Sequence, residues 1–261
     1  MQLDPPHSAA TALAHRLHAR HQGATAQALI AAAVDEPDLG RLAVVSSFGA
    51  ESVVLLHMLA QVAPDLPVLF IDTRLLFPET LSYQQEVAAT LGLTNVQVIR
   101  ASNLTLQAED PGNTLHQRDT DACCDLRKTR VLAAALEGYE SWITGRKRFQ
   151  ADTRSDLPRF EADGPRVKVN PLADWTADDL RAYIETHDLP RHPLVSRGYP
   201  SIGCTPCTTP VAEGEDVRAG RWRGQDKEEC GIHFVDGRAV PGPAPSARQD
   251  TNDAPQLLKR A

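Results

Sequence analysis

The chain has 261 residues, a formal net charge of −7 and 42% hydrophobic residues. This length and composition fit a globular protein with a sizeable core and exclude a largely disordered chain. The negative charge argues against nucleic-acid binding, which relies on broad basic surfaces. No apolar run approaches the roughly 20 residues of a membrane helix, and the first residues, MQLDPP, lack a secretory-signal pattern. We therefore expect a cytoplasmic protein without membrane or nucleic-acid partners.

Hydrophobic patterning along the chain predicts alternating strands and helices. Helical periodicity over residues 8–35 is followed by expected strands at 41–46, 66–71, 96–99, 141–145 and 168–172. Helices are expected at 51–62, 78–91, 121–136 and 176–187, the last opening with a capping-box pattern. Strands that alternate with helices of this length form βαβ units. The predicted fold is therefore α/β, an open, mostly parallel, twisted sheet flanked by helices.

The same pattern divides the chain into four parts. Residues 1–40 are predicted to be an N-terminal helical region, and residues 41–190 a nucleotide-binding α/β domain. Residues 191–237 are rich in proline and glycine and carry three of the five cysteines, so we expect a mobile C-terminal segment there. Residues 238–261 have the composition of a disordered tail.

Small, polar and basic residues follow three of the predicted strands. They are Ser46, Ser47, Phe48, Gly49, Ala50 and Glu51 after the first strand, Asp72, Thr73 and Arg74 after the second, and Thr144, Gly145 and Arg146 after the fourth. Ligands of open parallel sheets bind at the carboxyl ends of the strands. Small residues before a helix also let backbone N–H groups approach an anion. We therefore expect these residues to bind a small anionic substrate.

The cysteines form an adjacent pair, Cys123 and Cys124, a C-x-x-C motif, Cys204 and Cys207, and a single thiol, Cys230. Neighbouring residues on a helix point about 100° apart, so the adjacent pair cannot easily share one small ion such as zinc. A 4Fe–4S cluster takes one thiolate on each of four irons. The pattern favours such a cluster, with zinc and inert buried thiols as alternatives, and it leaves Cys230 over.

Longer motifs carry a resemblance to a known family. The loop at 46–52 resembles the phosphate-binding loop of adenine nucleotide alpha hydrolases, although Phe48-Gly49-Ala50-Glu51-Ser52 stands where ATP-splitting relatives carry Gly-Gly-x-Asp-Ser. The segments CCDLRK at 123–128, GCTPCT at 203–208 and KEECGIH at 227–233 resemble the motifs of assimilatory adenylyl-sulfate reductases of the iron–sulfur type, in the PAPS reductase family. The likeness covers roughly residues 40–235.

The resemblance implies a thioredoxin-dependent reduction of adenylyl sulfate to sulfite and AMP, in sulfate assimilation and cysteine biosynthesis. It implies that the Cys230 thiolate attacks the sulfur to form an S-sulfocysteine, which thioredoxin or a glutaredoxin-like donor then cleaves. Lys128, Arg218 and Arg221 match the family's phosphosulfate-contacting positions, and His233 follows Cys230 by three residues. It also implies one 4Fe–4S cluster, held by Cys123, Cys124, Cys204 and Cys207. We expect a homo-oligomer as well.

Three other functions stay open at this point. The substrate could be 3′-phosphoadenylyl sulfate, although reductases for that compound typically lack the four cluster cysteines. The protein could be a non-catalytic iron–sulfur sensor that binds a nucleotide, or an ATP-using sulfurtransferase that acts on tRNA. The sensor would leave Cys230 without a role, and the sulfurtransferase is disfavoured by the net charge and the altered loop.

Overall fold

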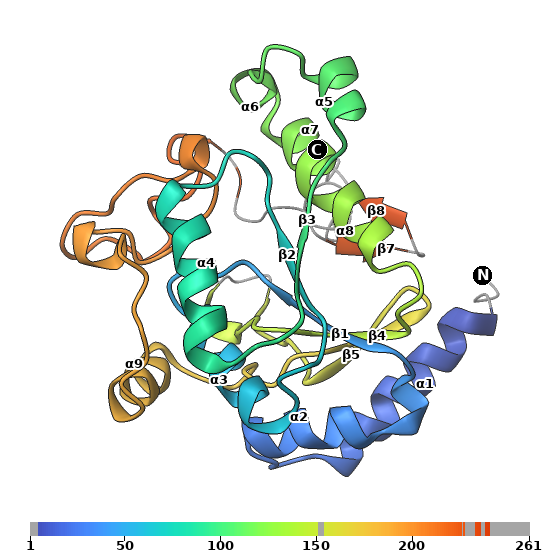
Figure 1. Ribbon diagram of the computed structural model, residues 1–261. Coiled ribbons are helices and arrows are strands. Elements are labelled where there is room, and N and C mark those ends of the chain that lie inside the picture. The colour runs from blue at the N-terminus through green and yellow to red at the C-terminus, as the bar shows by residue number, and fades with distance from the viewer. Residues whose placement is uncertain (1–4, 151–153, 226, 228–232, 236–237, 241–261) are drawn as a thin grey trace, which may run out of the picture.

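The computed structural model describes residues 5–150, 154–225, 227, 233–235 and 238–240. A six-stranded sheet in the order β3-β2-β1-β4-β6-β5 forms its centre, and all neighbouring pairs except β5–β6 are parallel (Figure 1). The strands are β1 Leu42–Ser46, β2 Val68–Ile71, β3 Val96–Ile99, β4 Ser141–Thr144, β5 Phe160–Asp163 and β6 Arg166–Val169. The predicted α/β fold with a mostly parallel sheet is confirmed.

Two strand assignments differ from the sequence prediction. The expected strand at 168–172 is β6, which begins and ends earlier, and its antiparallel partner β5 was not predicted. Strand β5 reads Phe-Glu-Ala-Asp, and two acidic residues hide it from a search for apolar runs. A separate hairpin pairs β7 His233–Val235 with β8 Arg238–Val240. The expectation of disorder from residue 238 onward is therefore wrong for 238–240, and residues 241–261 lie outside the described part.

Helices cover both faces of the sheet. They are α1 Pro5–Arg20, α2 Ala26–Asp35, α3 Ser52–Val62, α4 Pro78–Leu91, α5 Asn103–Glu109, α6 Leu115–Arg118, α7 Thr120–Cys124, α8 Arg130–Ala135 and α9 Ala177–Thr186. Helix α4 has the predicted bounds, because Pro78 fits the first turn and Gly92 closes the helix at a φ of 68°. The predicted capping box of α9 is present at Thr176 and Asp179. The short helices α5 and α6 were not predicted.

Alternate residues of the central strands bury opposite faces. Val44 of β1 packs in the larger core with residues of α1 to α4 and α9, whereas its neighbour Ala43 packs with Leu132 and Leu136 near α8 on the other face. Leu17 of α1 belongs to the larger core. The N-terminal helices therefore pack on the same core as the sheet. None of the described helices combines the length and the apolar character needed to cross a bilayer.

The helix predicted at 121–136 contains a wider turn. Between α7 and α8, residues Asp125–Thr129 form a π-helical turn, and the Thr129 hydroxyl donates a hydrogen bond back to the carbonyl oxygen of Cys124. A π turn holds one more residue than an α turn and is common at functional sites. Lys128, four residues after Cys124, lies within this wider turn and not in a regular α-helical turn.

A buried histidine fixes the segment after α9 to α4. His192 is 1% exposed, its Nδ1 accepts a hydrogen bond from the Leu194 N–H, and its Nε2 lies 3.0 Å from the Thr80 hydroxyl. Because Nδ1 accepts, Nε2 carries the proton in the neutral ring. Burial lowers the pKa of His192 to about 4. Protonation would place a second donor against the Leu194 N–H, which explains why the neutral form is preferred.

This low pKa predicts acid sensitivity. The unfolded chain binds a proton at His192 below about pH 6.5 and the folded chain only near pH 4, so stability is expected to fall as the pH drops from 6.5 to 4. The slope from one proton is at most about 1.4 kcal/mol per pH unit. Urea unfolding of His192→Gln should show a shallower loss over this window than the parent, whereas the exposed His15→Gln control should follow the parent. Parallel curves for the parent and His192→Gln would contradict the prediction.

Candidate active site

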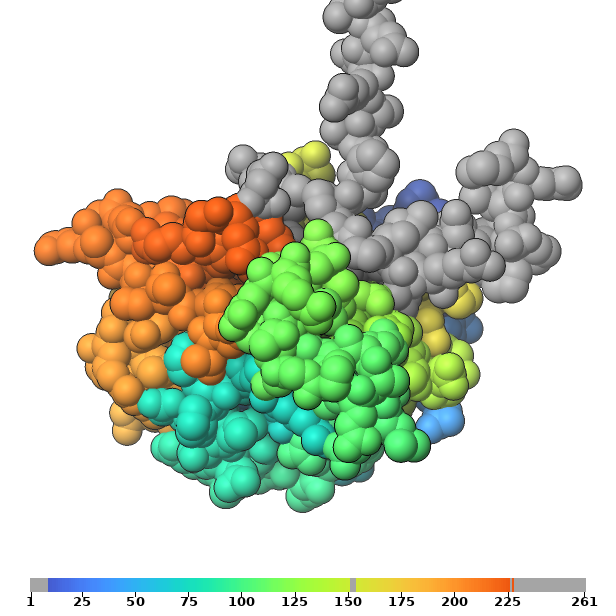
Figure 2. Space-filling view, turned by 90° about the horizontal axis from the view of Figure 1, so that it is seen from above, coloured from blue at the N-terminus to red at the C-terminus, as the bar shows by residue number. Residues whose placement is uncertain are grey.

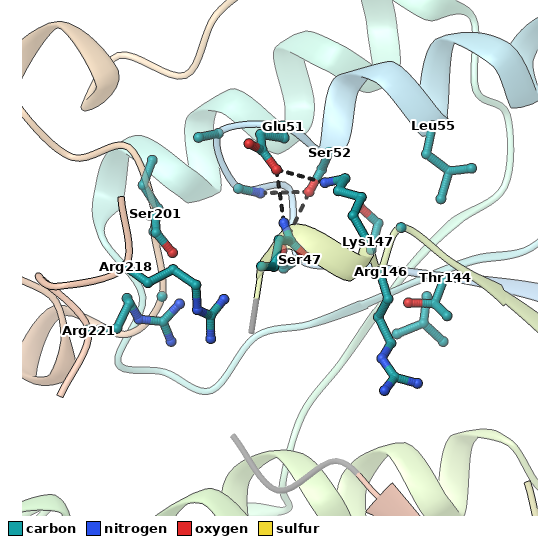
Figure 3. A pocket seen from close by; sticks show the side chains of 18 of the residues that line it. Ser47, Glu51, Ser52, Leu55, Thr144, Arg146, Lys147, Ser201, Arg218 and Arg221 are labelled. Atoms are coloured by element: carbon teal, nitrogen blue, oxygen red, sulfur yellow. Dashed lines mark hydrogen bonds and ion pairs between the residues drawn. The ribbon is translucent and has the colours of Figure 1, made fainter. Parts of the chain in front are cut away.

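A cavity of about 310 Å³ opens at the carboxyl edge of the sheet, beyond the ends of β1 and β4 (Figure 3). The strand order runs outward from β1 through β2 and β3 on one side and from β4 on the other, so the cavity lies at the topological switch point. Most of the predicted substrate-binding residues and cations line it, namely Ser46, Ser47, Gly49, Ala50, Glu51, Thr73, Thr144, Gly145, Arg146, Lys128, Arg218 and Arg221.

The loop after β1 is held by its own hydroxyl groups. The Ser46 hydroxyl accepts a hydrogen bond from the N–H of Phe48 at 3.2 Å, and the Ser52 hydroxyl accepts one from the N–H of Gly49 at 3.0 Å. Phe48 has a φ of 47°, and its side chain is fully buried against Phe70. The Phe48 side chain is therefore a core contact and not part of the cavity lining.

Of the residues after β2, some shape the turn and one lines the cavity. Asp72 accepts a hydrogen bond from the Arg74 N–H at 2.8 Å and pairs with Arg100 at 2.8 Å, so it shapes the turn. Neither Asp72 nor Arg74 is among the residues that line the cavity. Thr73 does, and its hydroxyl lies 3.2 Å from the Cys204 sulfur. This threonine therefore connects the cavity wall with the cysteine motifs.

Sequence analysis missed a buried ion pair in the cavity wall. The Lys147 ammonium donates to Glu51 Oε2 at 2.7 Å, and the Gln150 amide donates to the same oxygen at 2.9 Å (Figure 3). Burial lowers the pKa of Lys147, while Glu51 counteracts that shift. The pair joins the loop after β1 to the loop after β4. The only sign of this ion pair in the sequence is the basic run after β4 that contains Lys147. Its partner Glu51 lies 96 residues earlier in the chain.

Arg146 is oriented by the hairpin that sequence analysis missed. Its guanidinium donates to Glu161 of β5 at 2.7 Å, and the Asn170 amide donates to the same oxygen at 3.0 Å. Figure 3 shows the Arg146 side chain directed away from Lys147. A further cation that was not predicted, Arg154, also lines the cavity and donates to Gln150 at 2.7 Å. The loop after β4 is thus more basic at the cavity than the three predicted residues indicated.

Three cations from two distant segments lie at the cavity. Lys128 comes from the π turn, and Arg218 and Arg221 come from the segment after the C-x-x-C motif; Figure 3 shows the two arginines side by side. Arg221 packs on Gly203, where an added Cβ would lie 2.4 Å from Nη2 and 2.6 Å from the guanidinium carbon. A glycine is therefore needed beside Arg221. The arrangement gives a cavity wall that favours an anionic ligand.

The two cysteine motifs lie near one another and form no disulfide. Cys123, Cys124 and Cys204 are buried and Cys207 is half-buried. Burial raises the pKa of the Cys123 thiol to about 11, and the electrostatic influence of Cys204 and Cys207 adds to the rise. In the described part of the chain, no three His, Cys, Asp or Glu side chains are grouped as ligands for a single metal ion. Cys230 lies outside the described residues, and only the backbone of His233 is described.

Hydrogen bonds hold the two motifs and the arginine segment together. The N–H of Trp222 donates to the Cys207 carbonyl oxygen at 3.1 Å, and Thr208 forms an antiparallel bridge with Arg221. On the helix side, the buried Arg127 donates to the Thr73 carbonyl oxygen at 3.0 Å. Residues that follow each cysteine motif are therefore hydrogen-bonded to the arginine segment or to the cavity wall.

Comparison with known proteins supports one family. A family model described as the phosphoadenosine phosphosulfate reductase domain matches residues 41–210. The chain is 52% identical to the adenosine 5'-phosphosulfate reductase of Chelativorans sp. (strain BNC1), over 84% of this chain and 89% of that protein. It is 43% identical to the phosphoadenosine 5'-phosphosulfate reductase of Gloeobacter violaceus, over 74% of this chain and 82% of that protein.

Solved structures agree with the sheet topology. A crystal structure of phosphoadenylyl-sulfate (PAPS) reductase from Candida auris, a phosphate complex, matches with a TM-score of 0.64 and 26% identity, over 80% of this chain and 99% of that one. Candida glabrata FMN adenylyltransferase shares the fold alone, with a TM-score of 0.52 at 15% identity. The cavity position, the basic wall and these matches agree: the chain belongs to the phosphoadenosine phosphosulfate reductase domain family.

Proposed function

We propose that this chain reduces adenylyl sulfate to sulfite and AMP in sulfate assimilation, with Cys230 as the nucleophile and thioredoxin as the thiol donor. The observation that carries the proposal is the cavity at the switch point, whose wall brings Lys128, Arg218 and Arg221 together. Three relatives that are 40–55% identical to this chain are named adenosine 5'-phosphosulfate reductase. The cations would neutralise a phosphosulfate, which otherwise repels an incoming thiolate.

The chemistry consists of two displacements at sulfur. The Cys230 thiolate forms an S–S bond to the sulfate sulfur, the S–O bond to the phosphate breaks, and AMP leaves with the electron pair. A thioredoxin thiolate then attacks the Cys230 sulfur, which releases sulfite and forms a mixed disulfide. The second thioredoxin thiol resolves this disulfide and restores the Cys230 thiolate. The dithiol thereby supplies the two electrons that reduce the sulfur.

The four remaining cysteines fit a 4Fe–4S cluster. Cys123, Cys124, Cys204 and Cys207 would each hold one iron, so the thiols need not converge on one point as they would around a single ion. The buried indole N–H of Trp222, whose backbone bonds to Cys207, has no hydrogen-bond partner among the described residues, and a cluster sulfur would supply an acceptor. Bound there, the cluster would supply structural rigidity and an electrostatic field beside Lys128.

The phosphorylated nucleotide is a second candidate substrate. The Gloeobacter relative is named for that compound, and the cavity wall carries further cations in Arg146 and Arg154 that could meet a 3′-phosphate. The four cysteines favour adenylyl sulfate. A comparison of kcat/KM for the two nucleotides distinguishes the candidates, and we expect the higher value with adenylyl sulfate. A cytoplasmic location and a homo-oligomer remain part of this proposal.

The experiment that tests the function is an intact-mass measurement. Protein purified without oxygen is incubated with adenylyl sulfate and no thiol, and iron, labile sulfide and released AMP are counted in the same sample. We expect the added mass of one SO3 group per chain, one AMP per adduct and four irons per chain. Added thioredoxin should remove the adduct as sulfite. An unchanged mass would support a non-catalytic nucleotide sensor. Cleavage of ATP to AMP in a separate incubation with ATP would support the sulfurtransferase.

A substitution at Gly203 tests the arginine geometry. Gly203→Ala should push the Arg221 guanidinium away from its position and lower kcat/KM by about tenfold or more, because one charged donor to the transition state is misplaced. Stability should change little, since the atom that must move is the end of a flexible side chain. Gly112→Ala, where the new Cβ would meet only ordinary contacts, is the matched control. Parental kcat/KM in Gly203→Ala would exclude a strict requirement for this arginine position.

A further inference from the structure

The ammonium group of Lys147 is buried in the cavity wall and uses only part of its hydrogen-bonding capacity. The Lys147 side chain is 4% exposed, and its ammonium donates to Glu51 Oε2 at 2.7 Å. No other residue in the described part of the chain accepts a hydrogen bond from this ammonium. An ammonium carries three N–H donors, and a buried donor without an acceptor costs free energy. Lys147 can therefore bind a second anionic group in addition to Glu51.

Lys147 reaches the loop after β1 at the point where helix α3 begins. Figure 3 shows its side chain extending to Glu51, the residue before the first residue of α3. The backbone N–H groups of Ala50 and Glu51 donate to no acceptor among the described residues. The N-terminus of a helix carries a partial positive charge and free N–H groups, which together favour a phosphate. The ammonium and the loop therefore offer donors to the same ligand.

Two arginines lie close enough to Lys147 for their charges to act on it. Burial lowers the pKa of Lys147, and Glu51 counteracts this shift. The charges of Arg154 and Arg218, which both line the cavity, lower the pKa further. Arg218 belongs to the C-terminal part of the described chain, whose orange surface adjoins the green surface of α5 to α8 in Figure 2. Cations from segments far apart in the sequence therefore repel one another here, and a bound anion would lower that repulsion.

We propose that Lys147 binds the phosphate of adenylyl sulfate and neutralises Glu51 at the same time. The inference rests on the proposed function, which supplies this substrate. In the first displacement the S–O bond breaks and its electron pair stays on the phosphate oxygen, so the phosphate gains negative charge as AMP leaves. An ammonium beside it binds the leaving AMP more strongly than the substrate, which lowers the barrier. Lys147 is thus both a structural partner of Glu51 and a substrate-binding residue.

The test is equilibrium binding of AMP and of adenosine, which differ by the phosphate alone. Lys147→Met should weaken AMP binding about tenfold or more, because a charge-assisted hydrogen bond is lost and the Glu51 carboxylate stays unneutralised. The same variant should bind adenosine within about twofold of the parent, since adenosine has no phosphate to lose that contact. Arg148→Met removes the next cation along the chain, which does not line the cavity, and it should leave both Kd values within about twofold.

A second variant keeps the inference falsifiable if the unpaired carboxylate destabilises Lys147→Met. The double variant Lys147→Met with Glu51→Gln removes both charges, so neither member of the pair is left without its partner. Its AMP binding should remain at least about fivefold weaker than that of the parent, because the donor to the phosphate is still missing. Parental AMP binding in either variant, or equal losses for AMP and adenosine, would overturn the inference. Absence of an SO3 adduct in the parent would instead overturn the proposed function.

Discussion

Replacement of Cys230 by serine is expected to abolish both sulfite formation and the protein-bound SO3 group. A serine hydroxyl is not ionised at neutral pH and cannot form the S–S bond from which a thiol donor releases sulfite. Loss of a covalent nucleophile lowers turnover by at least roughly a thousandfold. Sulfite release and intact mass after incubation with adenylyl sulfate measure the two outcomes, and AMP release should disappear with them.

The matched substitution on a proposed cluster ligand should behave differently. Cys207→Ser is expected to lower iron and labile sulfide, because serine is a poor ligand for this cluster, whereas Cys230→Ser should keep the parental content. The iron and sulfide contents of these two variants distinguish the nucleophile from the cluster ligands, and this measurement does not depend on turnover. Sulfite formation by Cys230→Ser at more than a few per cent of the parental rate would assign the nucleophile elsewhere.

Replacement of Lys128 by alanine is expected to lower kcat/KM for adenylyl sulfate by roughly a hundredfold or more, with iron content unchanged. Lys128 is half-buried in the π turn and lines the cavity beside two arginines. One preorganised donor aimed at charge that develops in the transition state is typically worth two to three orders of magnitude. Steady-state sulfite formation measures the loss, and an iron and sulfide count on the same preparation reports the integrity of the cluster.

The control for this variant lies two residues further along the chain. Arg130 pairs with Glu109 and Asp125 at the surface and does not line the cavity, so Arg130→Ala should stay within about twofold of the parent. If Lys128→Ala lost its iron, the lysine would have a structural role at the cluster. Equal losses in both variants would point to a general effect of helix stability.

The sequence predicted the strands and helices whose signals are local. Strand β1 is a continuous apolar run, and α4 begins at Pro78 and ends before Gly92, so neighbouring residues alone define them. Strand β5 could not be found this way. Its Glu161 and Asp163 are half-buried or buried because Arg146 and Lys168 on other segments pair with them. An acidic strand is stable inside the protein only when the tertiary fold brings cationic side chains from other segments against its carboxylates.

In the candidate site, too, some features follow from the sequence and others depend on the tertiary fold. The position of the ligand-binding edge follows from the strand order, and most predicted residues do line one cavity. The directions of individual side chains do not follow from the sequence. Phe48 turns into the core because its backbone adopts a left-handed conformation, and Asp72 turns toward Arg100. Lys147 has its role through Glu51, a partner that no local pattern reveals.

The extra residue in the turn at Asp125–Thr129 has a consequence for how this helix could vary. Leu132 packs in the smaller core against the sheet and also lines the cavity, together with Lys128 four residues before it. Each residue of an α-helix advances the side-chain direction by about 100°. A chain shortened by one residue here would regain a regular helix, but it would rotate everything before the deletion relative to Leu132. Such a shortened protein would turn the adjacent cysteine pair by about 100° relative to α8, away from the C-x-x-C motif near which it now lies.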